Sequence, residues 1–156
     1  MAIVLALSGC STDLIRADLA NVDPPPTGKA SIWVIRPSYL SYAARDLTIK
    51  ANNSEIADLI KSSYTSFLMP PGKLKLSGQG WFFSWPHREI TIDVEQGQTY
   101  YLAWIAQETA SSELMRMLFP TINMNTLNWK LLDKKSAQPL LESTYYVKPT
   151  VLEITK

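Results

Sequence analysis

The sequence predicts an all-β protein, mainly an antiparallel β-sandwich, with short helical segments in its C-terminal part. Seven short runs of β-forming residues lie between residues 30 and 106, and Pro, Gly and Asn residues separate them. No long 3.6-residue periodicity occurs among these runs, as expected for a chain of short strands. The predicted strands are 31–36, 47–51, 55–60, 64–69, 73–77, 88–94 and 100–106.

The composition is that of one globular domain. The chain has 156 residues, of which 46% are hydrophobic and 19% are charged, enough for a real core. Lys and Arg number 15 and Asp and Glu 14, and this balance argues against a nucleic-acid-binding protein, which needs a basic face. With one Cys and one His, an intramolecular disulfide is excluded and a Cys/His zinc site lacks ligands.

The first strands are predicted from their apolar patterns and their turns. Residues 31–36 are apolar on both faces and end at Pro37, which is typical of a central strand. Residues 52–54, Asn-Asn-Ser, tolerate positive φ and join the next two strands into a hairpin. The strand 64–69 ends at Pro70-Pro71-Gly72, and the strand 73–77 alternates Lys with Leu.

The later strands supply the predicted core. Residues 88–94 alternate most clearly, with Ile90, Ile92 and Val94 on one face. Residues 100–106 are too apolar for an edge strand and are expected in the centre of a sheet, with Leu102 and Trp104 in the core. The C-terminal part is predicted to contain one or two helical turns at 113–119, a strand at 127–132, a helix at 136–143 and an extended segment at 145–154.

The amino terminus resembles the signal of a bacterial lipoprotein. Leu7-Ser8-Gly9-Cys10 has the form of a lipobox, an aliphatic residue and two small residues before Cys. The resemblance implies a signal peptide at 1–9 and a mature chain that begins at Cys10, which carries diacylglycerol and an N-linked acyl chain such as palmitate. A buried, unmodified Cys is the alternative. Ser11 follows the Cys where Asp would favour the inner membrane, so we expect a lipid anchor on the periplasmic face of the outer membrane.

The apolar run before Cys10 is unusual for such a signal. No Lys or Arg precedes the Cys, whereas a signal peptide normally opens with a basic region; this favours a start codon further upstream. The run is also far shorter than the roughly 20 residues of a spanning helix. Residues 10–29 then form a tether, in which Pro24, Pro25 and Pro26 favour an extended, semi-rigid spacer. The sandwich domain with its C-terminal extension is expected at 30–156.

Three landmarks in the middle of the chain carry a resemblance to a known family. They are a strand ending in Arg36-Pro37, a strand that ends at Pro71-Gly72, and Ile90–Val94 followed by a Gln-Gly-Gln-Thr-Tyr-Tyr-Leu segment at 96–102. In this order they resemble the DUF2846 family of bacterial lipoproteins and the related PEGA-like β-sandwich modules. The resemblance covers about residues 29–108 and implies an extracytoplasmic β-rich protein. It transfers no catalytic residue.

The residues give little support for an enzyme. His87 is not accompanied by a Gly-x-Ser-x-Gly nucleophile motif, and a surface or turn position is its ordinary explanation. The aspartates are scattered along strand ends and polar faces, so a pair of catalytic carboxylates is not indicated. No glycine-rich phosphate loop occurs. We therefore expect no catalytic residue, no metal and no cofactor beyond the lipid at Cys10.

Two apolar stretches are predicted to contact a partner. Trp81, Phe83 and Trp85 lie in a Trp-Phe-Phe-Ser-Trp-Pro segment between two strands, and aromatic clusters on exposed loops mark protein or sugar contacts. The second stretch contains Met115, Met117 and Phe119, and Met-rich surfaces dock on partners. For both stretches, packing in the core is the alternative.

Two functions remain open. The first is a non-enzymatic outer-membrane lipoprotein that is a structural subunit of a multiprotein cell-envelope assembly, such as a secretion or motility machine. Its partners would be other envelope proteins, with no nucleic acid. The alternative is an envelope module that binds peptidoglycan or another glycan. A flat exposed Trp platform would favour the glycan, and a broad apolar patch would favour the assembly.

Overall fold

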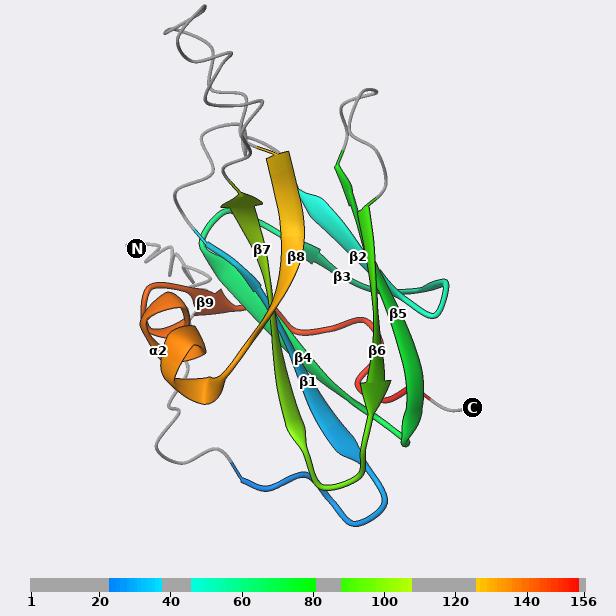
Figure 1. Ribbon diagram of the computed structural model, residues 1–156. Helices are drawn as coiled ribbons and strands as arrows, with labels where there is room; N and C mark the ends of the chain where they lie inside the picture. Colours follow the sequence, from blue (N-terminus) through cyan, green and yellow to red (C-terminus); the bar gives the residue numbers. More distant parts are fainter. Residues whose placement is uncertain (1–22, 38–45, 81–87, 108–125, 155–156) are drawn as a thin grey trace, which may run out of the picture.

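A computed structural model of the chain describes residues 23–37, 46–80, 88–107 and 126–154. In these residues two β-sheets pack face to face and one helix lies on the outer side of one sheet (Figure 1). The predicted all-β sandwich with a short C-terminal helix is therefore confirmed.

The first sheet has five strands and contains the predicted central strand. Its order is β8 (Thr126–Leu132), β7 (Thr99–Gln107), β1 (Ala30–Arg36), β4 (Ser63–Met69) and β9 (Tyr145–Tyr146). β1 is antiparallel to β4 but parallel to β7, and β9 is parallel to β4. The sheet is therefore mixed. The remaining strand pairs of the described residues are antiparallel, as predicted.

The second sheet has four strands in the order β3 (Ser54–Leu59), β2 (Leu47–Ala51), β5 (Gly72–Gly80) and β6 (Arg88–Val94). The predicted hairpin joins β2 to β3, and Asn52 and Asn53 at its turn have φ values of 47° and 69°. Such left-handed conformations favour Asn because its short polar side chain bonds locally. β5 is longer than predicted, since it continues through Gly78 to Gly80.

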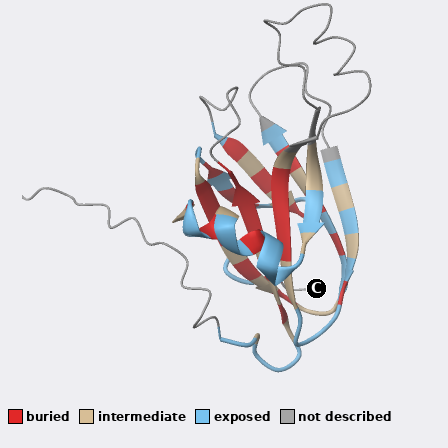
Figure 2. Ribbon diagram, turned by 60° about the vertical axis from the view of Figure 1, so that its left-hand side comes forward, coloured by how far each residue is buried: buried red, intermediate tan, exposed pale blue. Residues whose placement is uncertain are grey.

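The core lies between the two sheets and is formed by side chains of both. Figure 2 shows in red the buried positions along the strands. Val94, Leu102 and Trp104 are buried, as predicted. Ile90 and Ile92 pack against this core but are only partly buried. Their strand, β6, is the last of its sheet, so their outer side lacks a neighbouring strand among the described residues.

A second, smaller cluster lies on the outer face of the five-stranded sheet. The helix α2 (Lys134–Glu142) packs Ala137 and Leu141 against Ile35, Tyr101 and Ala103. The predicted helix at 136–143 is confirmed, but it begins two residues earlier. Its N-cap lies just before Lys134, where the Asp133 side chain accepts a hydrogen bond from the Ser136 N–H at 2.7 Å.

The C-terminal segment is extended, as predicted, but only β9 and a bridge at Glu153 pair as strands. The Val147 N–H donates to the Tyr64 carbonyl at 2.8 Å, and the Thr150 N–H donates to the Ile56 carbonyl at 2.7 Å. Tyr64 and Ile56 belong to different sheets. The segment therefore fastens the two sheets to each other along this side.

Candidate functional site

The residues predicted to carry function lie outside the described residues. They are the lipidation residue Cys10 and the contact residues Trp81, Phe83, Trp85, Met115, Met117 and Phe119. His87 also lies outside them, as does the helical segment predicted at 113–119. The structure does, however, fix the strand ends from which these segments start and to which they return.

Those strand ends lie together. The segment 81–87 joins the end of β5 to the start of β6, and 108–125 joins the end of β7 to the start of β8. Leu47 pairs with Gly80, and Gln107 pairs with Thr126. We call this end of the sandwich, formed by Arg36, Leu47, Gly80, Arg88, Gln107 and Thr126, the loop end. Both stretches that the sequence marked as contact surfaces are therefore anchored there.

Two tryptophans support the loop end. Trp104 of β7 and Trp129 of β8 pack edge to face, with ring centroids 4.8 Å apart and an interplanar angle of 70°, a favourable aromatic geometry. The rings lie over Gly78 of the facing sheet, where an added Cβ would be only 3.1 Å from Trp129 Cζ2. Gly78 therefore provides the space that lets the two sheets approach at this end.

A buried arginine closes the same end. Arg36 is 4% exposed, and its guanidinium donates a hydrogen bond to the Leu59 carbonyl of the other sheet. Burial lowers the pKa of Arg36, and the Asp46 carboxylate opposes that effect. The charge-assisted bond ties the end of β1 to the end of β3. This gives the Arg-Pro landmark of the sequence a structural reason.

The tether reaches the domain at the opposite end. The Gly97 N–H donates to the Lys29 carbonyl at 2.7 Å, and the Ser31 N–H donates to the Gln98 carbonyl at 3.0 Å. An ion pair joins the side chains of Lys29 and Glu153. We call this end, formed by residues 26–29 and the turn at 95–98, the tether end. Because β1 starts here and finishes at the loop end, the tether and the two contact stretches attach to opposite ends of the domain.

A groove of about 350 Å³ lies beside the tether end. Its volume is in the range of small-ligand sites, although it is open to solvent. Tyr101 forms part of its lining, with the tether on one side and the start of α2 on another. The lining residues are Asp23, Pro24, Pro25, Gly97, Gln98, Thr99, Tyr101, Leu132, Asp133 and Lys134.

An aromatic cluster borders this groove. The Trp33 ring stacks on the Tyr64 ring, with centroids 5.4 Å apart and an interplanar angle of 8°. The centroids of the Trp33 and Tyr101 rings lie 6.0 Å apart, and these two rings are tilted relative to each other. Trp33 is only partly buried. The sequence does not predict this surface, because Trp33 lies in a run that is apolar on both faces and is typical of a central strand. The large Trp ring among aliphatic neighbours is the signal that indicates it.

The tyrosines of this cluster are neutral at physiological pH. Burial raises the pKa of Tyr64 to about 12, with a further contribution from Tyr146. Burial also raises the pKa of Tyr101 and of Tyr146. Their hydroxyl groups therefore suit hydrogen bonding and packing better than proton transfer.

The described aspartates are not gathered into one site. Asp58 accepts a hydrogen bond from the Thr48 hydroxyl at 2.5 Å, and Asp133 caps α2. Asp93 is exposed on β6. Within the four described stretches of the chain, no three His, Cys, Asp or Glu residues gather in a way that could hold a metal ion. No helix in those stretches is long and apolar enough to span a membrane.

Comparison with known proteins does not identify relatives. No protein-family model matches the chain, and no curated protein matches it significantly.

Proposed function

We propose that this protein is a non-enzymatic outer-membrane lipoprotein that acts as a structural subunit of a cell-envelope assembly. Lipid at Cys10 holds it to the periplasmic face of the membrane, and the loop end contacts another envelope protein. The resemblance of residues 29–108 to the DUF2846 and PEGA-like lipoproteins supports an extracytoplasmic role.

The observation that carries the proposal is the placement of attachments at opposite ends. The tether meets the domain at Lys29, while the strands flanking 81–87 and 108–125 meet at the loop end. A nine-residue strand such as β5 spans about 30 Å. In a lipid-anchored chain built in this way, the strand ends that flank the aromatic and Met-rich stretches lie at the end of the domain opposite the tether, where a neighbouring protein is accessible.

The anchor is tested by intact mass spectrometry of the protein purified from its native membranes. We expect a mature chain that begins at Cys10 and carries a diacylglycerol and an acyl group. An unmodified Cys10, or a terminus elsewhere, would contradict the anchor. A Cys10→Ser protein should leave the outer-membrane fraction.

The contact surface is tested by alanine substitution in each stretch. Trp85→Ala or Met117→Ala should release the protein from its complex, as measured by pull-down from detergent-solubilised membranes, while the melting temperature stays near that of the wild type. His87→Ala is the matched control and should leave the complex intact. If His87→Ala abolished function while the aromatic and Met substitutions left fold and function intact, a catalytic role would replace the contact role.

A glycan-binding module is the second candidate, and the groove beside the tether end favours it. The groove combines the carboxylate of Asp133 and the amide of Gln98 with the nearby, partly buried ring of Trp33, as sugar hydroxyls and sugar faces require. Cosedimentation with purified peptidoglycan tests this role. Binding that is lost in Gln98→Ala and Trp33→Ala, but kept in Trp85→Ala, would favour the glycan.

A further inference from the structure

The two long sides of the sandwich differ in whether a described segment of the chain joins the edges of the two sheets. On one side, the C-terminal segment joins the sheets through the Thr150–Ile56 hydrogen bond, and it returns to β4 where the Leu68 N–H donates to the Leu152 carbonyl at 3.0 Å. On the other side, β6 and β8 are the last strands of their sheets, and no further strand pairs with either within the described residues. Figure 1 shows β6 with β5 as its one neighbour in the sheet.

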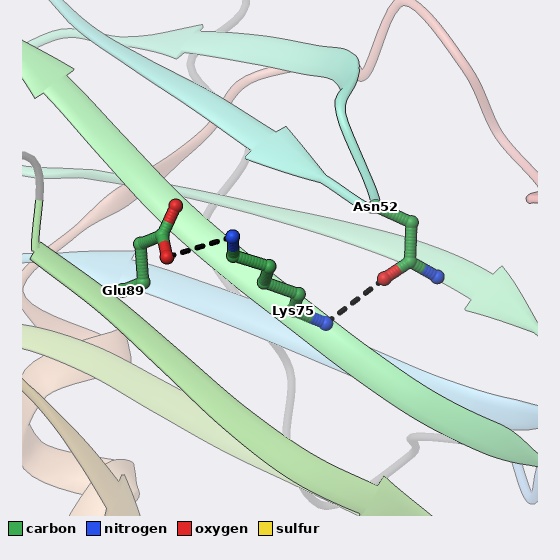
Figure 3. A network of polar contacts seen from close by, with 3 residues as sticks. All are labelled: Asn52, Lys75 and Glu89. Atoms are coloured by element: carbon green, nitrogen blue, oxygen red, sulfur yellow. Dashed lines mark hydrogen bonds and ion pairs between the residues drawn. The ribbon is translucent and has the colours of Figure 1, made fainter.

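The hydrogen bonds of β5 determine which N–H and C=O groups of β6 point to its outer edge. The Lys75 N–H donates to the Asn52 side chain at 2.9 Å (Figure 3). The Lys75 carbonyl accepts from the Asn52 N–H, also at 2.9 Å. Lys75 therefore directs its backbone groups away from β6. Thr91, its cross-strand partner, forms a non-hydrogen-bonded pair with it. The N–H and C=O groups of Thr91 consequently point to the outer edge.

The same alternation applies to the residues two positions away. Glu89 and Asp93 also direct their backbone groups outward, while those of Ile90 and Ile92 bond to β5. Among the described residues, the outer edge of β6 thus presents three N–H and three C=O groups that do not bond to β5. An extended peptide adds to such an edge by main-chain hydrogen bonds, and its side chains give specificity.

Charge defines the chemistry of the peptide that fits. On the solvent face, β5 presents the basic Lys73 and Lys75, and β6 presents Asp93 opposite Lys73 and Glu89 diagonal to Lys75. The Lys75 and Glu89 side chains form an ion pair at 2.8 Å (Figure 3). A strand added beyond β6 would place its own solvent-facing side chains beside these carboxylates, so basic residues suit those positions.

The inward face of the same edge is apolar. Ile90 and Ile92 are partly buried, and Leu131 of β8 is 45% exposed although it pairs with the buried Leu102. The side chains of an added strand alternate between the two faces. Those that point inward would cover this apolar strip.

We propose that the outer edge of β6 binds an extended segment of a partner protein by β-strand addition, and that this segment alternates basic with apolar residues. A second copy of this chain does not fit the edge as well. Pairing of two β6 strands about Thr91 would set Glu89 opposite Asp93, and like charges directly opposite each other are destabilising. The inference deepens the proposed function, on which it rests for the presence of a partner.

The test uses the full-length lipidated protein in detergent micelles and a labelled Val-Lys-Val-Lys-Val-Lys-Val peptide. We expect the peptide to bind and to slow amide hydrogen exchange at Glu89, Thr91 and Asp93, whereas a Val-Glu-Val-Glu-Val-Glu-Val peptide should not. Thr91→Pro removes an N–H that makes no bond to β5, and Pro is tolerated at such edge positions. It should weaken binding about tenfold or more, while Thr91→Val should bind as the wild type does.

A charge variant keeps the test decisive if Thr91→Pro fails to fold. Asp93→Lys leaves the backbone unchanged. It should weaken binding of the basic peptide and strengthen binding of the acidic peptide. Three results would each overturn the proposal. They are equal binding of both peptides, no protection from hydrogen exchange on β6, and a dimer that Thr91→Pro converts to a monomer. The pull-down of Trp85→Ala tests the proposed function separately. The synthetic peptide is expected to bind the edge of β6, so its binding does not depend on contacts at the loop end.

Discussion

Alanine at Gly78 would place one methyl group between the two sheets at the loop end. The new Cβ would lie 3.1 Å from Trp129 Cζ2, 3.2 Å from Leu47 Cδ1 and 3.4 Å from Trp104 Cζ3. Carbon atoms pack best at about 3.5–4.0 Å, so the rings or the Leu47 side chain must shift. Overpacking costs about 1–3 kcal/mol, and replacing Gly in a strand returns about 0.5–1 kcal/mol. The difference is a net loss of about 0–2.5 kcal/mol in the free energy of unfolding, and three contacts of 3.1–3.4 Å place Gly78→Ala above the lower end of that range.

Urea unfolding measures this loss, and near-ultraviolet circular dichroism reports the geometry of the Trp104–Trp129 pair. Gln79→Ala is the matched control, since Gln79 is the next residue and is exposed; it should change stability by less than about 0.5 kcal/mol. Adding Leu47→Ala should relieve part of the crowding, so the double variant should lose less than the sum of the single losses. A Gly78→Ala protein as stable as the wild type, with an unchanged aromatic spectrum, would refute the packing argument.

Four further predictions follow from single side chains. Arg36→Met should lower the free energy of unfolding, measured in urea, by about 1.5–3 kcal/mol, because it removes the charge-assisted bond between the sheets. Arg36→Lys should not recover the wild-type free energy of unfolding. Thr65→Val should raise the unfolding midpoint in urea, because the buried Thr65 hydroxyl has no hydrogen-bond partner among the described residues; a lower midpoint would contradict this. Since the pKa of Tyr64 is raised to about 12, its contribution to stability is complete below pH 10 and is lost as the pH rises toward 12; Tyr64→Phe should flatten that loss in urea titrations. The pKa of Asp133 is lowered, chiefly by the Ser136 backbone N–H, so its contribution is complete above the ordinary carboxyl pKa and is lost as the pH falls through the lowered value; Asp133→Asn should keep the cap but remove this pH dependence of the melting temperature.

Local patterns in the sequence predicted most of the strands. The alternation of Ile90, Ile92 and Val94 and the Asn52-Asn53 turn depend on a few consecutive residues, and both are confirmed. The continuation of β5 through Gly78 was missed, because glycines there suggested a turn. That glycine is required by Trp104 and Trp129, which lie far from it in the sequence.

Features that depend on distant parts of the chain could not be predicted. The parallel pairing of β1 with β7 requires a crossover through the other sheet, and no local pattern reveals it. The contact of Arg36 with Leu59 and the groove beside Tyr101 also arise from tertiary placement alone. The predicted contact residues remain a prediction, since they lie outside the described residues.

The central claim is that the protein contacts its partner from the end opposite its anchor. Site-specific photo-crosslinking in living cells tests it most directly, with the reactive residue at Gln79 near the loop end or at Gln96 at the tether end. Both residues are exposed, so solvent access is matched. The account predicts that Gln79 forms a crosslink to another envelope protein and that Gln96 does not. A crosslink from Gln96 alone, or from neither residue, would contradict the account.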